Sequence, residues 1–142
     1  LYLKPDELEK SVADRFARYE TIKENETDAE LYLTEDCDIL LCAFGATARV
    51  VKSAVNEARA MGIKAGLFRP KTLWPFPVKE LNEAAKSAKK LLSVEMSMGQ
   101  MIDDIKLAIN CSKPVEFYGR TGGIIPNPAE ILAEIKKVGG AE

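Results

Sequence analysis

From Asp36 onward, short apolar runs alternate with longer segments in which apolar residues recur every three or four positions. Apolar runs of this length are typical of strands buried on both faces of a sheet. The amphipathic segments between them are typical of helices that cover such a sheet. The predicted strands are 38–44, 63–68, 91–96 and 114–119, and the predicted helices are 45–62, 78–90, 99–110 and 127–138. This alternation predicts parallel strands joined by right-handed crossovers, and therefore a three-layer α/β/α domain.

The N-terminal part of the chain follows a different pattern. Pro5 with Asp6 and Glu7 suits the first turn of a helix, where acidic groups face the positive end of the helix dipole. The apolar residues that follow fall on one stripe, made by Leu8, Val12, Phe16, Tyr19 and Ile22. The polar stretch 23–30 predicts the end of this helix and a flexible joint.

These patterns predict how the chain is divided. Residues 30–34 (ELYLT) predict a short edge strand. We therefore expect residues 1–30 to form a helix and a joint, and residues 31–142 to form the α/β domain. Because the chain begins at Leu1 and not at Met, we also expect it to be part of a longer protein.

The composition argues against several classes of function. The formal net charge of −2 does not favour a nucleic-acid partner, and no apolar run approaches the ~20 residues that span a membrane. The absence of histidine removes the Ser–His–Asp triad, the Cys–His pair and most zinc sites. Three cysteines without paired spacing predict reduced thiols in the cytoplasm and too few thiolates for an iron–sulfur cluster. We expect no metal, no cofactor and no catalytic residue in this chain.

Ligands of open α/β sheets bind beyond the carboxyl ends of the strands, where four loops begin, at Gly45, Arg69, Glu95 and Gly119. The first loop carries only one of the three glycines of a dinucleotide-binding fingerprint, so a plain strand–helix turn is favoured. Thr47 is the predicted N-cap of the helix that follows. The N–H groups at this helix start could still receive a carboxylate or phosphate.

Two further loops carry polar residues. Glu95 at a strand end and Gln100 at a helix start could point into a shared cleft, but a carboxylate that accepts hydrogen bonds from loop amides is favoured. The sequence YGRTGG lacks the Lys-Ser/Thr ending of a phosphate-binding loop, so its glycines are best explained by a sharp turn. Arg120 in this loop could bind an anion or pair with an acid across an interface.

The segment LFRPKTLWPFP (67–77) has no ionisable side chain between Lys71 and Val78, which argues against a catalytic lid. Its prolines fix backbone torsions and favour a rigid loop. Trp74 and Phe76 could anchor an interface or pack onto the domain's own sheet. Arg69, just before the loop, is a candidate contact for a ligand or an interface.

The string DILLCAFGATARVVKSAVNEARAMGIKAGLFRPKTLWPFP, followed by VEMSMGQM and YGRTGG, resembles the C-terminal region of the alpha subunit of 2-oxoacid:ferredoxin oxidoreductases. The match covers roughly residues 36 to 138, and its specific parts are RPKTLWPFP and E-x-x-x-G-Q. Members acting on 2-oxoisovalerate, 2-oxoglutarate and pyruvate remain possible. The resemblance implies a transketolase C-terminal-like domain with a five-stranded, mostly parallel sheet whose first strand is antiparallel.

The resemblance also implies a reaction in which a 2-oxoacid, CoA and oxidised ferredoxin give acyl-CoA, carbon dioxide and reduced ferredoxin. Thiamine diphosphate, Mg and iron–sulfur clusters supply that chemistry, and the motifs that bind them in this family are absent from this sequence. The expected role is a non-catalytic assembly domain beside a thiamine-interacting domain and other subunits, with CoA and ferredoxin as partners of the whole enzyme. The alternative is a stand-alone α/β module that binds a small anionic ligand or nucleotide at the strand ends.

Overall fold

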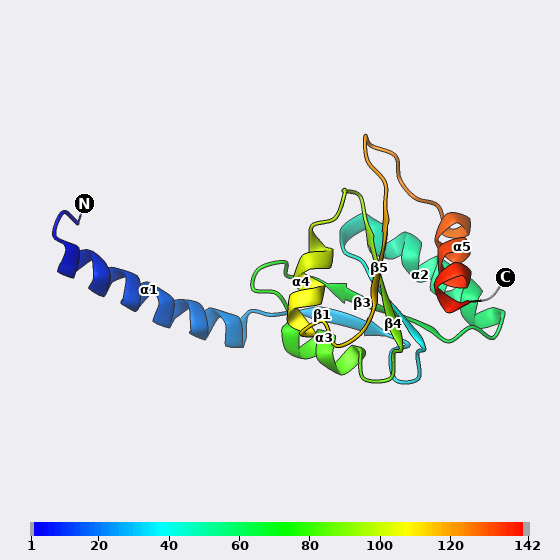
Figure 1. Ribbon diagram of the computed structural model, residues 1–142, viewed down its shortest axis with the longest axis horizontal. Coiled ribbons are helices and arrows are strands. Elements are labelled where there is room, and N and C mark those ends of the chain that lie inside the picture. Colours follow the sequence, from blue (N-terminus) through cyan, green and yellow to red (C-terminus); the bar gives the residue numbers. More distant parts are fainter. Residues whose placement is uncertain (1, 141–142) are drawn as a thin grey trace.

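The computed structural model describes residues 2–140 and contains one five-stranded sheet with helices on both faces (Figure 1). The elements in chain order are α1 (Pro5–Asn25), β1 (Ala29–Tyr32), β2 (Ile39–Cys42), α2 (Gly45–Ala60), β3 (Ala65–Pro70), α3 (Val78–Ala84), β4 (Lys90–Glu95), α4 (Met101–Ala108), β5 (Val115–Gly119) and α5 (Pro128–Gly139). The predicted α/β class is confirmed.

The sheet has the strand order β1-β3-β2-β4-β5. Strands β2 to β5 are mutually parallel, and β1 pairs antiparallel with β3 at the edge. In the central strands Leu41 pairs with Leu67 on one side and with Leu92 on the other. The expectation of a mostly parallel sheet with an antiparallel first strand is therefore confirmed.

Two apolar layers cover the two faces of the sheet, because successive side chains of a strand point to opposite faces. Ile39 and Leu41 of β2 pack with buried residues of α2 and α5, whereas Leu40 and Cys42 pack with residues of α3 and α4. All four residues of β2 are buried. The runs of consecutive apolar residues in the sequence therefore correspond to strands buried on both faces, as predicted.

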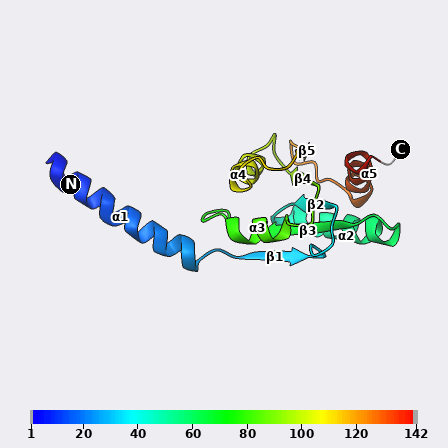
Figure 2. The ribbon, with the colours of Figure 1, turned by 60° about the horizontal axis from the view of Figure 1, so that its bottom comes forward.

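Helix α1 projects away from the α/β body, and only its C-terminal end lies beside it (Figures 1 and 2). None of its residues is buried. The predicted boundary between residues 30 and 31 passes through β1, and the division into two parts stays a prediction. No helix within residues 2–140 is long and apolar enough to span a membrane.

Some local predictions need correction. Helix α2 begins at Gly45 with Phe44 as its N-cap, so Thr47 is not the N-cap but a buried residue of the first turn. Gly45 has a φ of 59°, a conformation that favours glycine and lets the chain turn directly into the helix. The predicted N-cap Asn127 is confirmed, with Glu130 completing a capping box.

The helix predicted for residues 78–90 ends early, at Ala84. The ammonium group of Lys113 donates hydrogen bonds to the carbonyl oxygens of Ala85, Lys86 and Ala88. These carbonyl groups, which follow the helix, thereby gain hydrogen-bond partners. Val78, predicted to face the core, is exposed because it lies at the start of the helix beside the proline loop. Periodicity alone did not detect this carbonyl-binding lysine.

Gly66 of β3 lies against the segment that connects β1 to β2. A Cβ atom at Gly66 would lie 2.6 Å from the carbonyl oxygen of Leu33 and 3.0 Å from Cβ of Cys37. We predict that Gly66→Ala lowers the free energy of unfolding by about 2 kcal/mol, because backbone atoms must shift to accommodate the methyl group. Urea unfolding of the purified chain measures this change.

Gly139→Ala is the matched control for this substitution. Its Cβ would meet only the flexible end of Ile39, at 3.2 Å, so a much smaller loss is expected. Equal stability of the two variants would contradict the tight packing inferred for Gly66.

Candidate functional site

The candidate site lies at the carboxyl ends of the parallel strands, where the loops after β2, β3, β4 and β5 begin. Figure 1 shows that the loops after β4 and β5 rise from the same end of the sheet. This is the edge at which open α/β sheets bind ligands. Glu95 and Gly119 pair with each other in register, so these two loops start at the same level.

Glu95 is the most deeply placed charged group of this edge, with only 2% of its surface exposed. One carboxylate oxygen accepts hydrogen bonds from the backbone N–H groups of Gln100 and Met101, at 2.9 and 3.0 Å. The other accepts one from the N–H of Ile102 at 2.9 Å. These are donors that the start of α4 leaves without a partner inside the helix. Glu95 therefore caps α4 from the preceding strand.

Two serine hydroxyls complete the surroundings of this carboxylate. Ser93 donates to one oxygen and Ser97 to the other, each at 2.9 Å. Burial raises the pKa of Glu95, but the backbone N–H groups and the hydroxyls outweigh it, so the net pKa lies below the ordinary value. With five donors, the carboxylate is ionised and has no proton to exchange near neutral pH. The geometry matches the favoured interpretation of a brace for loop amides.

Ser93 and Ser97 were not among the residues predicted for the site. They stand two residues before and two residues after Glu95, a spacing that places hydroxyls on the same side of an extended chain as the carboxylate. This spacing could have identified both serines as hydrogen-bond donors to Glu95. Gln100 contributes its backbone N–H, while its side chain is exposed.

Arg69 pairs inside its own domain. Its guanidinium group lies 3.1 Å from the carboxylate of Glu30 in β1, which also receives the ammonium group of Lys52 at 2.6 Å. The hydrogen bond from Lys52 is the main cause that lowers the pKa of Glu30. This cluster connects the antiparallel edge strand to β3 and α2. Arg69, a predicted contact for a ligand or an interface, therefore pairs with a carboxylate of its own domain.

Arg120 also pairs with an acid of its own chain. Its guanidinium group lies 3.1 Å from Glu130, and the hydroxyl of Tyr118 donates to the same carboxylate at 3.2 Å. Nε of Arg120 is buried without a hydrogen-bond partner among the described residues. Its pairing therefore fixes the loop after β5 onto the first turn of α5.

Gly45 and Arg69 are brought together at one hollow of about 270 Å³, which Lys71 and Leu73 also line. Helix α2 starts here with no acidic residue in its first turn and no side-chain cap. Thr47 lies just inside this start and is buried. Glu95 ends β4, Gln100 and Arg120 lie on the loops after β4 and β5, and none of these three predicted site residues lines this hollow.

The two aromatic residues of the proline loop differ in their surroundings. Phe76 lies with its ring centroid 6.2 Å from that of Phe68, a buried core residue, so it packs onto its own domain. Trp74 is 59% exposed and meets the ring of Tyr19 in α1 edge-on, at 5.4 Å. Phe76 therefore packs onto the domain's own core, whereas Trp74 remains at the surface.

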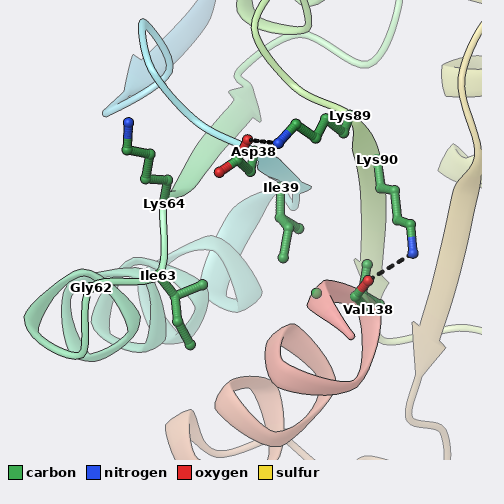
Figure 3. Close-up of a pocket in the computed structure, with 9 residues that line it drawn as sticks. Asp38, Ile39, Gly62, Ile63, Lys64, Lys89, Lys90 and Val138 are labelled. Atoms are coloured by element: carbon green, nitrogen blue, oxygen red, sulfur yellow. Dashed lines mark hydrogen bonds and ion pairs between the residues drawn. The ribbon is translucent and has the colours of Figure 1, made fainter. Parts of the chain in front are cut away.

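A hollow of about 230 Å³ lies at the opposite edge, near the amino ends of β2, β3 and β4 (Figure 3). Its lysines are held by partners of the same chain. Lys89 lies 2.8 Å from Asp38, and Lys90 donates to the carbonyl oxygen of Val138 at 2.9 Å. The contact of Lys90 holds the start of β4 to the end of α5.

The donor side chains do not fit the metals of the family that the sequence resembles. Among residues 2–140 no group of three or more His, Cys, Asp or Glu side chains could hold a metal ion. Cys37 and Cys42 are buried in the core, where burial raises the pKa of both thiols, and Cys111 is exposed in the turn after α4. Iron–sulfur clusters need converging thiolates, which these three residues do not provide.

We predict that Glu95→Gln lowers the free energy of unfolding at pH 7 by about 2–3 kcal/mol, because an amide cannot accept hydrogen bonds from all five donors. A carboxylate whose pKa is lowered in the folded state contributes its full stabilisation above its unfolded pKa, ordinarily 4.5. The difference from wild type should therefore disappear as the pH falls below that value and through the lowered pKa. Urea unfolding between pH 7 and pH 3 measures it.

Glu116→Gln is the control, because Glu116 is exposed on the edge strand β5. It is expected to leave the free energy of unfolding nearly unchanged across the same pH range. A Glu95→Gln variant as stable as this control at pH 7 would contradict the role assigned to the carboxylate.

Comparisons with known proteins agree with this fold. Ketoisovalerate oxidoreductase subunit VorB of Methanothermobacter marburgensis is 44% identical over 140 residues, which are 99% of this chain and 40% of that subunit. 2-Oxoglutarate synthase subunit KorA of the same organism is 37% identical over 130 residues, 92% of this chain and 34% of that subunit. This chain thus spans about 40% or less of the length of these relatives.

Two solved structures share the architecture. A 2-oxoglutarate:ferredoxin oxidoreductase from Magnetococcus marinus, with 2-oxoglutarate, coenzyme A and succinyl-CoA bound, matches with a TM-score of 0.79 at 24% identity, covering 96% of this chain and 24% of that one. A split-gene transketolase, described as an inactive beta4 tetramer, matches with a TM-score of 0.62 at 16% identity, covering 78% of this chain and 40% of that one. These matches confirm the transketolase-like fold.

A family model described as pyruvate:ferredoxin oxidoreductase core domain II matches residues 37–131, which is more than half of the chain. The matched segment runs from the start of the central strand into α5 and includes all four loops of the candidate site. The resemblance derived from the sequence is thereby confirmed, and the chain belongs to the pyruvate:ferredoxin oxidoreductase core domain II family.

Proposed function

We propose that this chain is a non-catalytic assembly domain of a 2-oxoacid:ferredoxin oxidoreductase of the cytoplasm. The enzyme would convert a 2-oxoacid and CoA into acyl-CoA and carbon dioxide and pass the electrons to ferredoxin. Thiamine diphosphate, Mg and iron–sulfur clusters, held by other parts of the enzyme, would supply the carbanion and electron-transfer chemistry. The family assignment and the subunits named above support this proposal.

The non-catalytic role is supported by one observation: the charged groups at the carboxyl edge form hydrogen bonds and ion pairs within the chain. Glu95 accepts five hydrogen bonds within the chain. Arg69 and Arg120 each pair with a carboxylate of the same chain. A general acid or base must be able to exchange a proton with a substrate, which a saturated and ionised carboxylate does not do. These groups therefore stabilise the loops and strands of the domain.

The proposed substrate is a branched-chain 2-oxoacid such as 2-oxoisovalerate. The relative named as a ketoisovalerate oxidoreductase subunit is 44% identical, whereas the 2-oxoglutarate synthase subunit is 37% identical. In this proposal residues 1–30 form the joint toward the thiamine-interacting part of the enzyme. Residues 31–142 form the transketolase-like domain. CoA and ferredoxin are partners of the whole enzyme.

Calorimetric titration of thiamine diphosphate into the isolated chain should give no binding heat. Mixing the chain with the other parts of the enzyme should restore 2-oxoisovalerate-dependent ferredoxin reduction, because the chain supplies the assembly surface. Arg69→Met and Arg120→Met should retain wild-type turnover in preparations whose assembly is intact.

Two results would overturn the proposal. Tight binding of thiamine diphosphate to the isolated chain would assign it a direct role in the chemistry. Loss of turnover in a fully assembled Arg69→Met or Arg120→Met enzyme would do the same. A rise in melting temperature with inorganic phosphate, without association with other subunits, would instead support a stand-alone anion-binding module.

A further inference from the structure

The N-terminal helix carries an apolar surface that the rest of the described chain does not cover. Leu8, Val12 and Phe16 are 46%, 37% and 58% exposed. With the half-buried Tyr19 they lie three to four residues apart, which places them on one side of α1. We call these four residues the α1 stripe. Figures 1 and 2 show the helix projecting from the body, with no other element along most of its length.

A projecting helix of this kind needs a partner to be stable. Most helical stability in proteins comes from packing of an amphipathic face, and isolated helices of moderate length are marginal in water. Helix α1 has 21 residues, none of them buried. Its side-chain interactions with the rest of the chain are limited to its C-terminal part, so a surface that covered its apolar face would stabilise it.

The α1 stripe continues onto the α/β body through aromatic contacts. Phe16 and Tyr19 have ring centroids 5.5 Å apart, and Tyr19 meets Trp74 at 5.4 Å. Beside this contact a hollow of about 550 Å³ separates the end of α1 from the proline loop, and Trp74, Phe76 and Val78 line it. Charged side chains, among them Glu20, Glu24 and Lys79, also line this hollow, so the apolar stripe reaches the body through the contact of Tyr19 with Trp74.

The charges around the stripe argue against a second copy of this chain as the partner. At about 100° per residue, Arg15 falls within the stripe, and Glu9, Glu20 and Glu24 share one flank. In a parallel pair of α1 helices Arg15 would face its own copy. In an antiparallel pair the acidic flanks would face each other. Both arrangements place like charges together, which is destabilising.

We infer that the α1 stripe and Trp74 form a docking surface for another part of the parent oxidoreductase. The matching surface is an apolar groove with an acidic residue opposite Arg15 and basic residues opposite the Glu9–Glu24 flank. Arg15 is exposed and takes part in none of the ion pairs found within residues 2–140, so an acidic residue of the partner can pair with it without breaking a contact of this chain. More than half of each relative lies beyond the matched region, which gives such a groove a source. This inference rests on the proposed function.

The test compares Phe16→Glu with Thr21→Glu in the assembled enzyme. Both residues are exposed on α1, and Thr21 lies on the side of the helix opposite the stripe. We expect Phe16→Glu to weaken assembly about tenfold or more, because an apolar anchor is replaced by a charge, while Thr21→Glu assembles as wild type does. Native mass spectrometry over a range of concentrations measures the assembled fraction.

Two additional measurements make the outcome unambiguous. The melting temperature of the isolated chain should be the same for both variants, because neither residue is buried. Backbone amides of residues 8–22 should exchange with deuterium rapidly in the isolated chain and slowly in the assembled enzyme, since docking would stabilise the helix.

The outcomes separate the docking surface from the proposed function. Assembly of wild type and Phe16→Glu to the same extent would overturn the docking surface and leave the proposed function standing. Failure of the wild-type chain to join the other subunits would overturn both. A dimer of the isolated chain that Phe16→Glu dissociates, with enzyme assembly unaffected, would identify a second copy as the occupant and overturn the inference.

Discussion

Burying a carboxylate costs several kcal/mol unless hydrogen bonds replace the lost water, and this domain buries one at the carboxyl edge of its sheet. Glu95 ends β4, caps α4 through three backbone N–H groups, and through its own carbonyl oxygen accepts the N–H of Arg120 after β5. One residue thus joins two strands and a helix. The position of the loop after β4 depends on this carboxylate remaining ionised and in place.

The two arginines of this edge follow a similar design, because each pairs with a carboxylate of another element of the chain. Arg69 joins β3 to β1, and Arg120 joins the loop after β5 to α5. Such pairs add little stability when exposed, but they fix the relative positions of the elements that carry them. A domain built this way is suited to presenting a fixed surface, which agrees with the proposed assembly role.

The strands and the faces of the helices could be predicted from the sequence because their apolar periodicity reflects burial directly. The antiparallel placement of β1 came only from the family resemblance, since ELYLT carries no sign of direction. Thr47 was wrongly predicted as an N-cap because its residue type suits that position, whereas the observed N-cap is Phe44, three residues earlier, and the helix begins at Gly45 with a positive φ. The exposure of the α1 stripe could not be predicted, because periodicity shows that a face is apolar but not what covers it.

The carboxylate of Glu130 closes both ends of the loop after β5. It accepts hydrogen bonds from the N–H of Asn127 and the hydroxyl of Tyr118, and it pairs with Arg120. The intervening tip, with Gly122 and Gly123 in left-handed conformations, does not contribute to this closure. Both ends of the loop are therefore held together independently of its tip, and the sequence of the tip can change without disturbing the sheet beneath it.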